Sequence, residues 1–109
     1  MSTLTEVRAL LSDPERWTKQ AEARDEHGTP VNAWDAEATC WCLYGALIRV
    51  TNTGMYANEE YNKACEQIRK ELSAGYEHEW ISEFNDHSSH SQVIEMLDSV
   101  ISKENENEC

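Results

Sequence analysis

The stretch of residues 35–50 constrains the fold most, because it is apolar on nearly every side when placed on a helical wheel. Its sequence is Asp-Ala-Glu-Ala-Thr-Cys-Trp-Cys-Leu-Tyr-Gly-Ala-Leu-Ile-Arg-Val. The Asp35 carboxylate can accept hydrogen bonds from amides of a first helical turn, which is typical of an N-cap. A helix that lacks a polar face belongs inside a fold. The sequence therefore predicts a buried central helix over 35–50, closed by Thr51-Asn52-Thr53-Gly54.

Four residues of this stretch fall on one helical face and are predicted to be core residues: Trp41, Cys42, Gly45 and Ile48. Glycine lowers helix propensity by about 1 kcal/mol relative to alanine. We therefore expect Gly45 to lie where another backbone passes too close for a Cβ atom.

Capping signals and apolar stripes place the other elements around this centre. Helices are expected over about 3–12, from a cap at Asn58 to about Ser73, over about 76–84, and from a capping box at Ser89 onwards. A single turn is expected after Asp13. Residues 18–33 predict a short hairpin or loop, with a four-residue turn from Asp25 to Gly28.

The predicted fold class is therefore mainly α: one compact domain, residues 1–102, with four to five helices around residues 35–50. Residues 103–109, Lys-Glu-Asn-Glu-Asn-Glu-Cys, carry no core residue and are expected to be a disordered acidic tail. No segment has the ~20 apolar residues of a membrane span or the pattern of a signal peptide. Cysteines without a spaced framework indicate reduced thiols, so a cytoplasmic location is expected, without membrane association.

Charge is the main functional signal of the chain. The net charge is −12, with eleven acids and eight bases in residues 1–70 but ten acids and one base in residues 71–109. Such a surface repels nucleic acid, because phosphate binding needs clustered Lys and Arg. It suits a partner protein with a basic surface. The candidate binding residues are Glu71, Glu77, Glu79, Glu83, Asp86, Glu95 and Asp98.

Alternative sites rest on less specific patterns. A nucleophilic Cys42 could use His78, His87 or His90 as base, with Asp86 or Asn85 orienting the imidazole. Against this, a thiol on an apolar face is inert. A second alternative is a ligand-binding polar cluster of Arg24, Asp25, Asn85 and Asp86, whose residues could instead only shape a turn and end a helix. The His and Cys spacing does not fit a metal site, and no cofactor is expected.

Several motifs together resemble the family catalogued as domain of unknown function 6197, short proteins from actinobacteria, their phages and other mobile elements. The resemblance spans residues 4–101. It rests on Trp17-Thr18, Ala23-Arg24-Asp25 with Gly28 and Pro30-Val31, Trp41-Cys42 with Gly45-Ala46-Leu47, and Phe84-Asn85-Asp86 with Val93 and Leu97. It implies a fold and a genomic setting but no activity.

These observations lead to one functional expectation and one alternative. The chain is expected to be a non-enzymatic, acidic accessory factor that binds and blocks a host nucleic-acid-handling protein, as an anti-CRISPR or anti-restriction protein or DNA mimic in the host cytoplasm. The alternative is a small enzyme or ligand-binding domain that uses Cys42 and the Arg24/Asp25/Asn85/Asp86 cluster.

Overall fold

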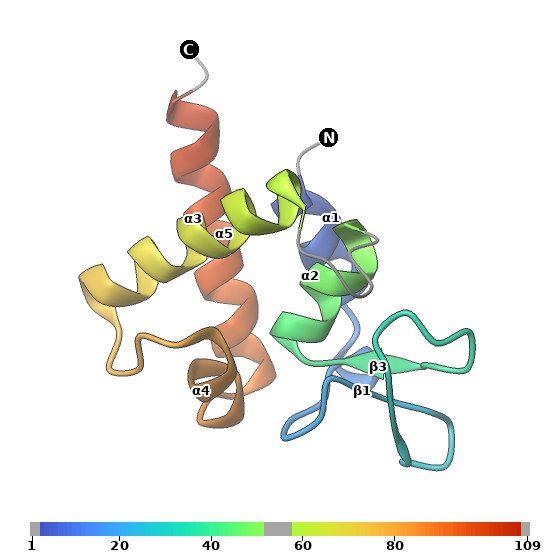
Figure 1. Ribbon diagram of the computed structural model, residues 1–109. Helices are drawn as coiled ribbons and strands as arrows, with labels where there is room; N and C mark the ends of the chain where they lie inside the picture. Colours follow the sequence, from blue (N-terminus) through green and yellow to red (C-terminus); the bar gives the residue numbers. More distant parts are fainter. Residues whose placement is uncertain (1–2, 52–57, 108–109) are drawn as a thin grey trace.

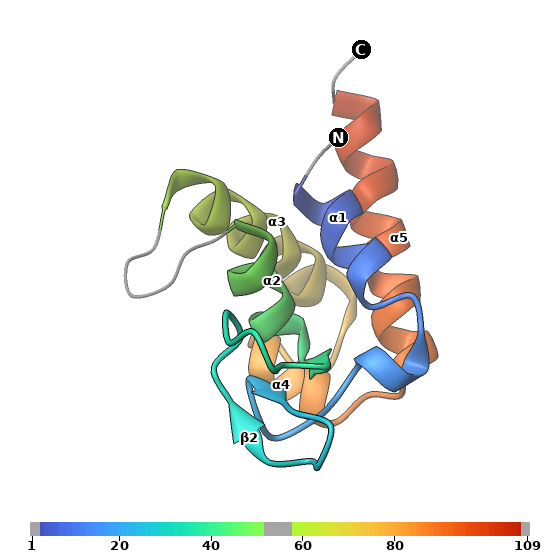
Figure 2. The ribbon, with the colours of Figure 1, turned by 90° about the vertical axis from the view of Figure 1, so that its right-hand side faces the viewer.

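The computed structural model describes residues 3–51 and 58–107. Their helices are α1 (Thr3–Leu10), the 3-10 turn η1 (Pro14–Arg16), α2 (Leu43–Thr51), α3 (Glu59–Gly75), α4 (Ile81–Asp86) and α5 (His90–Asn107). Their strands are β1 (Ala23–Arg24), β2 (Pro30–Val31) and β3 (Cys40–Trp41). Figures 1 and 2 show the helices stacked together, with the strands gathered at one end of the molecule. The predicted mainly-α single domain is confirmed.

Helix α2 occupies the centre of the fold. It contacts α1, α3, α4 and β3, and its residues Leu43, Ala46 and Leu47 have no exposed surface. Helix α5 packs against α1 and α3 and completes the core from the other side (Figure 2). The apolar stretch therefore forms the centre of the domain, as its composition predicts.

The predicted bounds of the central helix, 35–50, are wrong, because the helix begins only at Leu43. The Asp35 carboxylate accepts a hydrogen bond from the Glu37 amide and closes a local turn instead of capping a helix. The Thr39 amide then donates to the Arg24 carbonyl, and the Cys42 amide to the Glu22 carbonyl. Residues 39–42 thus pair with the chain around β1, which removes them from the helix.

The strands form a small antiparallel sheet in the order β2-β1-β3. Ala23 lies opposite Val31 on one side and Trp41 on the other. The predicted hairpin is present, with Gly28 at a φ of 81° and its amide donating to the Asp25 carbonyl. The third strand was not predicted, because its partner strand is distant in sequence.

The local capping predictions agree with the structure. Asn58 caps α3 by accepting from the Tyr61 amide, and Asp13 caps η1 by accepting from the Glu15 amide. Before α5, the Ser89 amide donates to Gln92 Oε1 while the Gln92 amide donates to Ser89 Oγ. This reciprocal pair is the predicted capping box.

Several helix ends differ from the sequence expectation. α1 ends at Leu10, α3 ends at Gly75, α4 spans Ile81–Asp86 rather than about 76–84, and α5 continues to Asn107. Most of the predicted acidic tail is thus helical backbone. Residues 108–109 lie outside the described residues, as do residues 52–54, which were expected to close the central helix.

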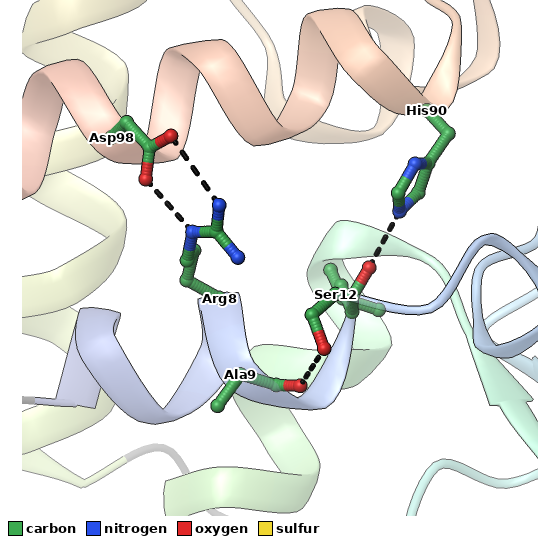
Figure 3. A network of polar contacts seen from close by, with 6 residues as sticks. Arg8, Ala9, Ser12, His90 and Asp98 are labelled. Carbon is green, nitrogen blue, oxygen red and sulfur yellow. Dashed lines mark hydrogen bonds and ion pairs between the residues drawn. The ribbon is translucent and has the colours of Figure 1, made fainter.

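Polar contacts fix α1 against α5 (Figure 3). The Arg8 Nε donates to Asp98 Oδ1 at 2.8 Å, and His90 Nε2 lies 2.6 Å from the carbonyl oxygen of Leu11. At the end of α1, Ser12 Oγ donates to the Ala9 carbonyl. The two helices are therefore held at both ends of their contact.

Candidate functional site

Three of the seven candidate acidic residues, Glu71, Asp86 and Asp98, contact residues of other elements. Glu71 has a side chain only 10% exposed, and it accepts hydrogen bonds from Ser99 Oγ and Lys103 Nζ. The hydrogen bond from Lys103, more than the opposing effect of burial, lowers the pKa of the Glu71 carboxyl. Glu71 is therefore part of the contact between α3 and α5.

Asp98 and Asp86 also have internal partners. Asp98 pairs with Arg8 on the α1 side of α5. Asp86 is half-buried at the end of α4, and its Oδ1 accepts the amide of Gln20 at 2.8 Å. Gln20 has a φ of 61°, a left-handed conformation that a residue with a Cβ rarely adopts. Asp86 therefore holds a strained loop in place.

The remaining four candidates, Glu77, Glu79, Glu83 and Glu95, are exposed. The first three lie within residues 77–83, between α3 and the first turn of α4, which we call the acidic segment. Glu95 comes from α5 and lies close enough to Tyr76 to contribute, after burial and Glu71, to a raised pKa of that phenol. The first three carboxylates therefore lie close together along the chain, and Glu95 lies near Tyr76, which directly precedes the acidic segment.

An exposed tryptophan lies inside the acidic segment. Trp80 keeps 57% of its surface accessible, and the Arg69 guanidinium carbon lies 4.6 Å from its ring centroid. Trp80, Ile81 and Phe84 are large apolar residues within the helix predicted over about 76–84, yet only the latter two are buried. The acidic neighbours of Trp80 in sequence, Glu79 and Glu83, are the signal that could have placed it at the surface.

Histidines cluster next to this segment. The rings of His78 and His87 stack with centroids 4.5 Å apart and an interplanar angle of 14°, and His78 Nδ1 lies 3.3 Å from Glu83 Oε1. Within residues 3–51 and 58–107, no group of three or more His, Cys, Asp or Glu side chains is arranged to hold a metal ion. The stack therefore orders the segment against the end of α4.

Cys42 lies at the start of α2, beside a cavity of about 240 Å³. The residue is 7% exposed, and its Sγ accepts a hydrogen bond from the Gly45 amide at 3.2 Å. Burial raises the pKa of the Cys42 thiol, and the nearby Asp86 and Glu22 carboxylates raise it further. A neutral thiol is a poor nucleophile.

The candidate catalytic residues are only partly brought together. Cys42 and Asp86 line the same cavity, with Gln20, Glu22, Tyr44 and Ser82. Among the described residues that line it, none is a histidine; His87 stacks on His78 instead.

The candidate polar cluster is distributed over two hydrogen-bonding centres. Arg24 donates to Thr18 Oγ1, to the Lys19 carbonyl and to the Gly28 carbonyl, so it holds the loop before β1 against the hairpin turn. The Asp25 carboxylate accepts the amides of His27 and Thr29 inside that turn.

Asn85 forms the second centre, and it is completely buried. Its Oδ1 accepts from Trp17 Nε1 at 2.7 Å and from the Leu43 amide at 3.0 Å. Its Nδ2 donates to the carbonyl of Thr18 at 3.0 Å. Thr18 therefore links the two centres through its hydroxyl and its carbonyl, a role that the sequence analysis missed.

A model of the family of unknown function DUF6197 matches residues 2–103. The chain belongs to this family. No curated protein and no solved structure matches the DUF6197 chain described above. In the part of the chain that the structure describes, no helix is long and apolar enough to cross a membrane.

Proposed function

We propose that this DUF6197 chain is a non-enzymatic binding factor whose acidic segment docks on a basic surface of a partner protein. The observation that carries the proposal is the concentration of the exposed carboxylates Glu77, Glu79 and Glu83 around an exposed Trp80. Tryptophan and arginine are enriched among the residues that dominate binding energy at protein interfaces.

The proposed partner is a protein that handles nucleic acid. Carboxylates on a folded frame can occupy a groove whose Lys and Arg side chains otherwise contact phosphates. A phage or mobile-element setting, as the family resemblance implies, makes a host restriction or CRISPR effector a suitable target, blocked in the host cytoplasm. The internal roles of Glu71, Asp86 and Asp98 limit the proposed contact to Glu77, Glu79, Glu83 and Glu95.

The alternative function, at Cys42, receives less support. A ligand in the cavity beside Cys42 would meet a buried thiol with a raised pKa and two carboxylates. Arg24 and Asn85, the polar residues expected to recognise such a ligand, are committed to loop carbonyls and to the start of α2. These contacts favour a structural role for both residues.

The test compares wild type with E77K/E79K/E83K in capture from a bacterial host lysate, followed by affinity measurements on the protein recovered. The triple variant should lose the partner, because each reversed charge would face a basic surface. Binding by wild type should weaken as salt rises, since exposed charges are screened beyond about 8–10 Å near physiological salt.

The matched control is E15K/E26K/E37K, which changes the net charge equally at exposed positions away from the acidic segment. The control should retain the partner. Wild type should also displace DNA from the partner protein. Equal affinity of all three proteins at low and high salt would refute the proposal, and unchanged circular dichroism spectra would exclude unfolding as the cause of lost binding.

A further inference from the structure

The outer side of α3 carries a shallow, open groove lined by residues of this helix alone. Its lining includes Arg69, Lys70 and Glu66, together with small or polar residues such as Cys65 and Ser73. Bases therefore outnumber acids in this groove, in a chain whose net charge is −12. The groove and the acidic segment meet at the Arg69–Trp80 contact.

This surface has two halves of opposite charge on either side of an exposed aromatic ring. In a two-fold symmetric dimer, each half of a patch contacts the other half of the same patch on the second copy. Here such pairing would place the acidic segment of one copy on the α3 groove of the other, with both Trp80 rings near the axis. The patch is therefore complementary to itself.

We propose that the chain associates with a second copy of itself through this surface, with Glu77 and Glu79 of each copy facing Arg69 and Lys70 of the other. Trp80 is 57% exposed in the single chain, and a Trp side chain buries about 150–250 Å² when it is fully covered. The interface is small, so the dimer should be weak and should depend on protein concentration.

The dimer does not depend on the proposed partner, but it would cover the same carboxylates. A basic partner and a second copy then exclude each other, so dissociation of the dimer exposes the acidic segment for binding. The reversible dimer thus sets how much of the protein is free to bind.

The decisive experiment is a charge exchange measured by sedimentation velocity on the purified full chain. Wild type should form a dimer as its concentration rises. R69E/K70E alone and E77K/E79K alone should remain monomeric, because each variant places like charges opposite each other. An equimolar mixture of the two variants should dimerise again, because each reversed half then meets its complement.

Trp80 gives a second, independent test. W80A should weaken the wild-type dimer at least tenfold, whereas W34A removes another exposed tryptophan, in the loop between β2 and β3, and should leave the dimer unchanged. Circular dichroism checks that each variant is folded. Wild type that stays monomeric at every concentration, or variants that dimerise like wild type, would overturn the proposal. R69E/K70E should keep its affinity for a basic partner, so failure of the dimer and failure of the proposed function are distinguishable.

Discussion

Gly45 shows how one residue determines the packing of two segments. A Cβ atom at this position would overlap the carbonyl oxygen of Glu22, and the Cys42 amide donates to that same oxygen. The prediction from sequence, that another backbone passes close to Gly45, is confirmed. The three residues predicted to be in the core with it, Trp41, Cys42 and Ile48, are also buried, although Trp41 belongs to a strand and Cys42 precedes the helix.

Gly45→Ala should therefore destabilise the protein by roughly 1–3 kcal/mol, because backbone atoms must move to admit the methyl group. The measurement is the free energy of unfolding from urea denaturation. Gly75→Ala is the matched control, since a Cβ there meets no atom within 4 Å. The control should be neutral or slightly stabilising, and equal effects of the two substitutions would contradict the proposed close approach.

Asn85 contributes to stability in a different way, by hydrogen bonding rather than by small size. Asn85→Ala leaves the Trp17 indole and the Leu43 amide without an acceptor, and each unpaired buried donor costs roughly 1–3 kcal/mol. We expect a loss of at least about 2 kcal/mol in urea denaturation. Asn62→Ala, at an exposed position of α3, should change stability by less than about 0.5 kcal/mol.

At the scale of elements, the helix ends with caps near in sequence were predictable and the others were not. Asn58 and Ser89 cap helices that begin next to them, so local sequence contains the whole signal. α2 begins where Asn85 accepts from the Leu43 amide, across 42 residues. No local pattern distinguishes this start from one at Asp35, which is why the sequence predicted a longer helix.

The contact between α3 and α5 should depend on pH through Glu71. Its pKa is lowered in the folded protein, so its stabilising effect is present above the unfolded pKa of about 4.3 and is lost as pH falls through the folded pKa. Glu71→Gln should be less stable than wild type at pH 7, and the difference should shrink on acidification.

Thermal unfolding of both proteins from pH 7 to pH 2 measures this difference. The control for loss of a carboxylate is Glu95→Gln, at an exposed position of α5, which should change stability at pH 7 by less than about 0.5 kcal/mol. A gap between Glu71→Gln and wild type that widens as pH falls would contradict the assignment.

At the scale of the whole molecule, charge counted along the chain and charge arranged in space differ. The count assigns seven acids to one candidate surface, but folding directs Glu71, Asp86 and Asp98 into contacts with other elements. It also places Arg69, from the less acidic part of the chain, on Trp80. The sequence could predict that the C-terminal half is acidic, but not which carboxylates remain accessible.

The capping of α2 by Asn85 has a consequence for the order of events during synthesis. The ribosome releases Leu43 long before residue 85, so the central helix emerges without the side chain that completes its first turn. The nascent N-terminal half contains the small sheet, in which β1 pairs with residues 40–41. It therefore emerges before Asn85 can accept the hydrogen bond from the Leu43 amide. We therefore expect the N-terminal half to become stable only when α4 has been synthesised, so that the domain folds as one cooperative unit.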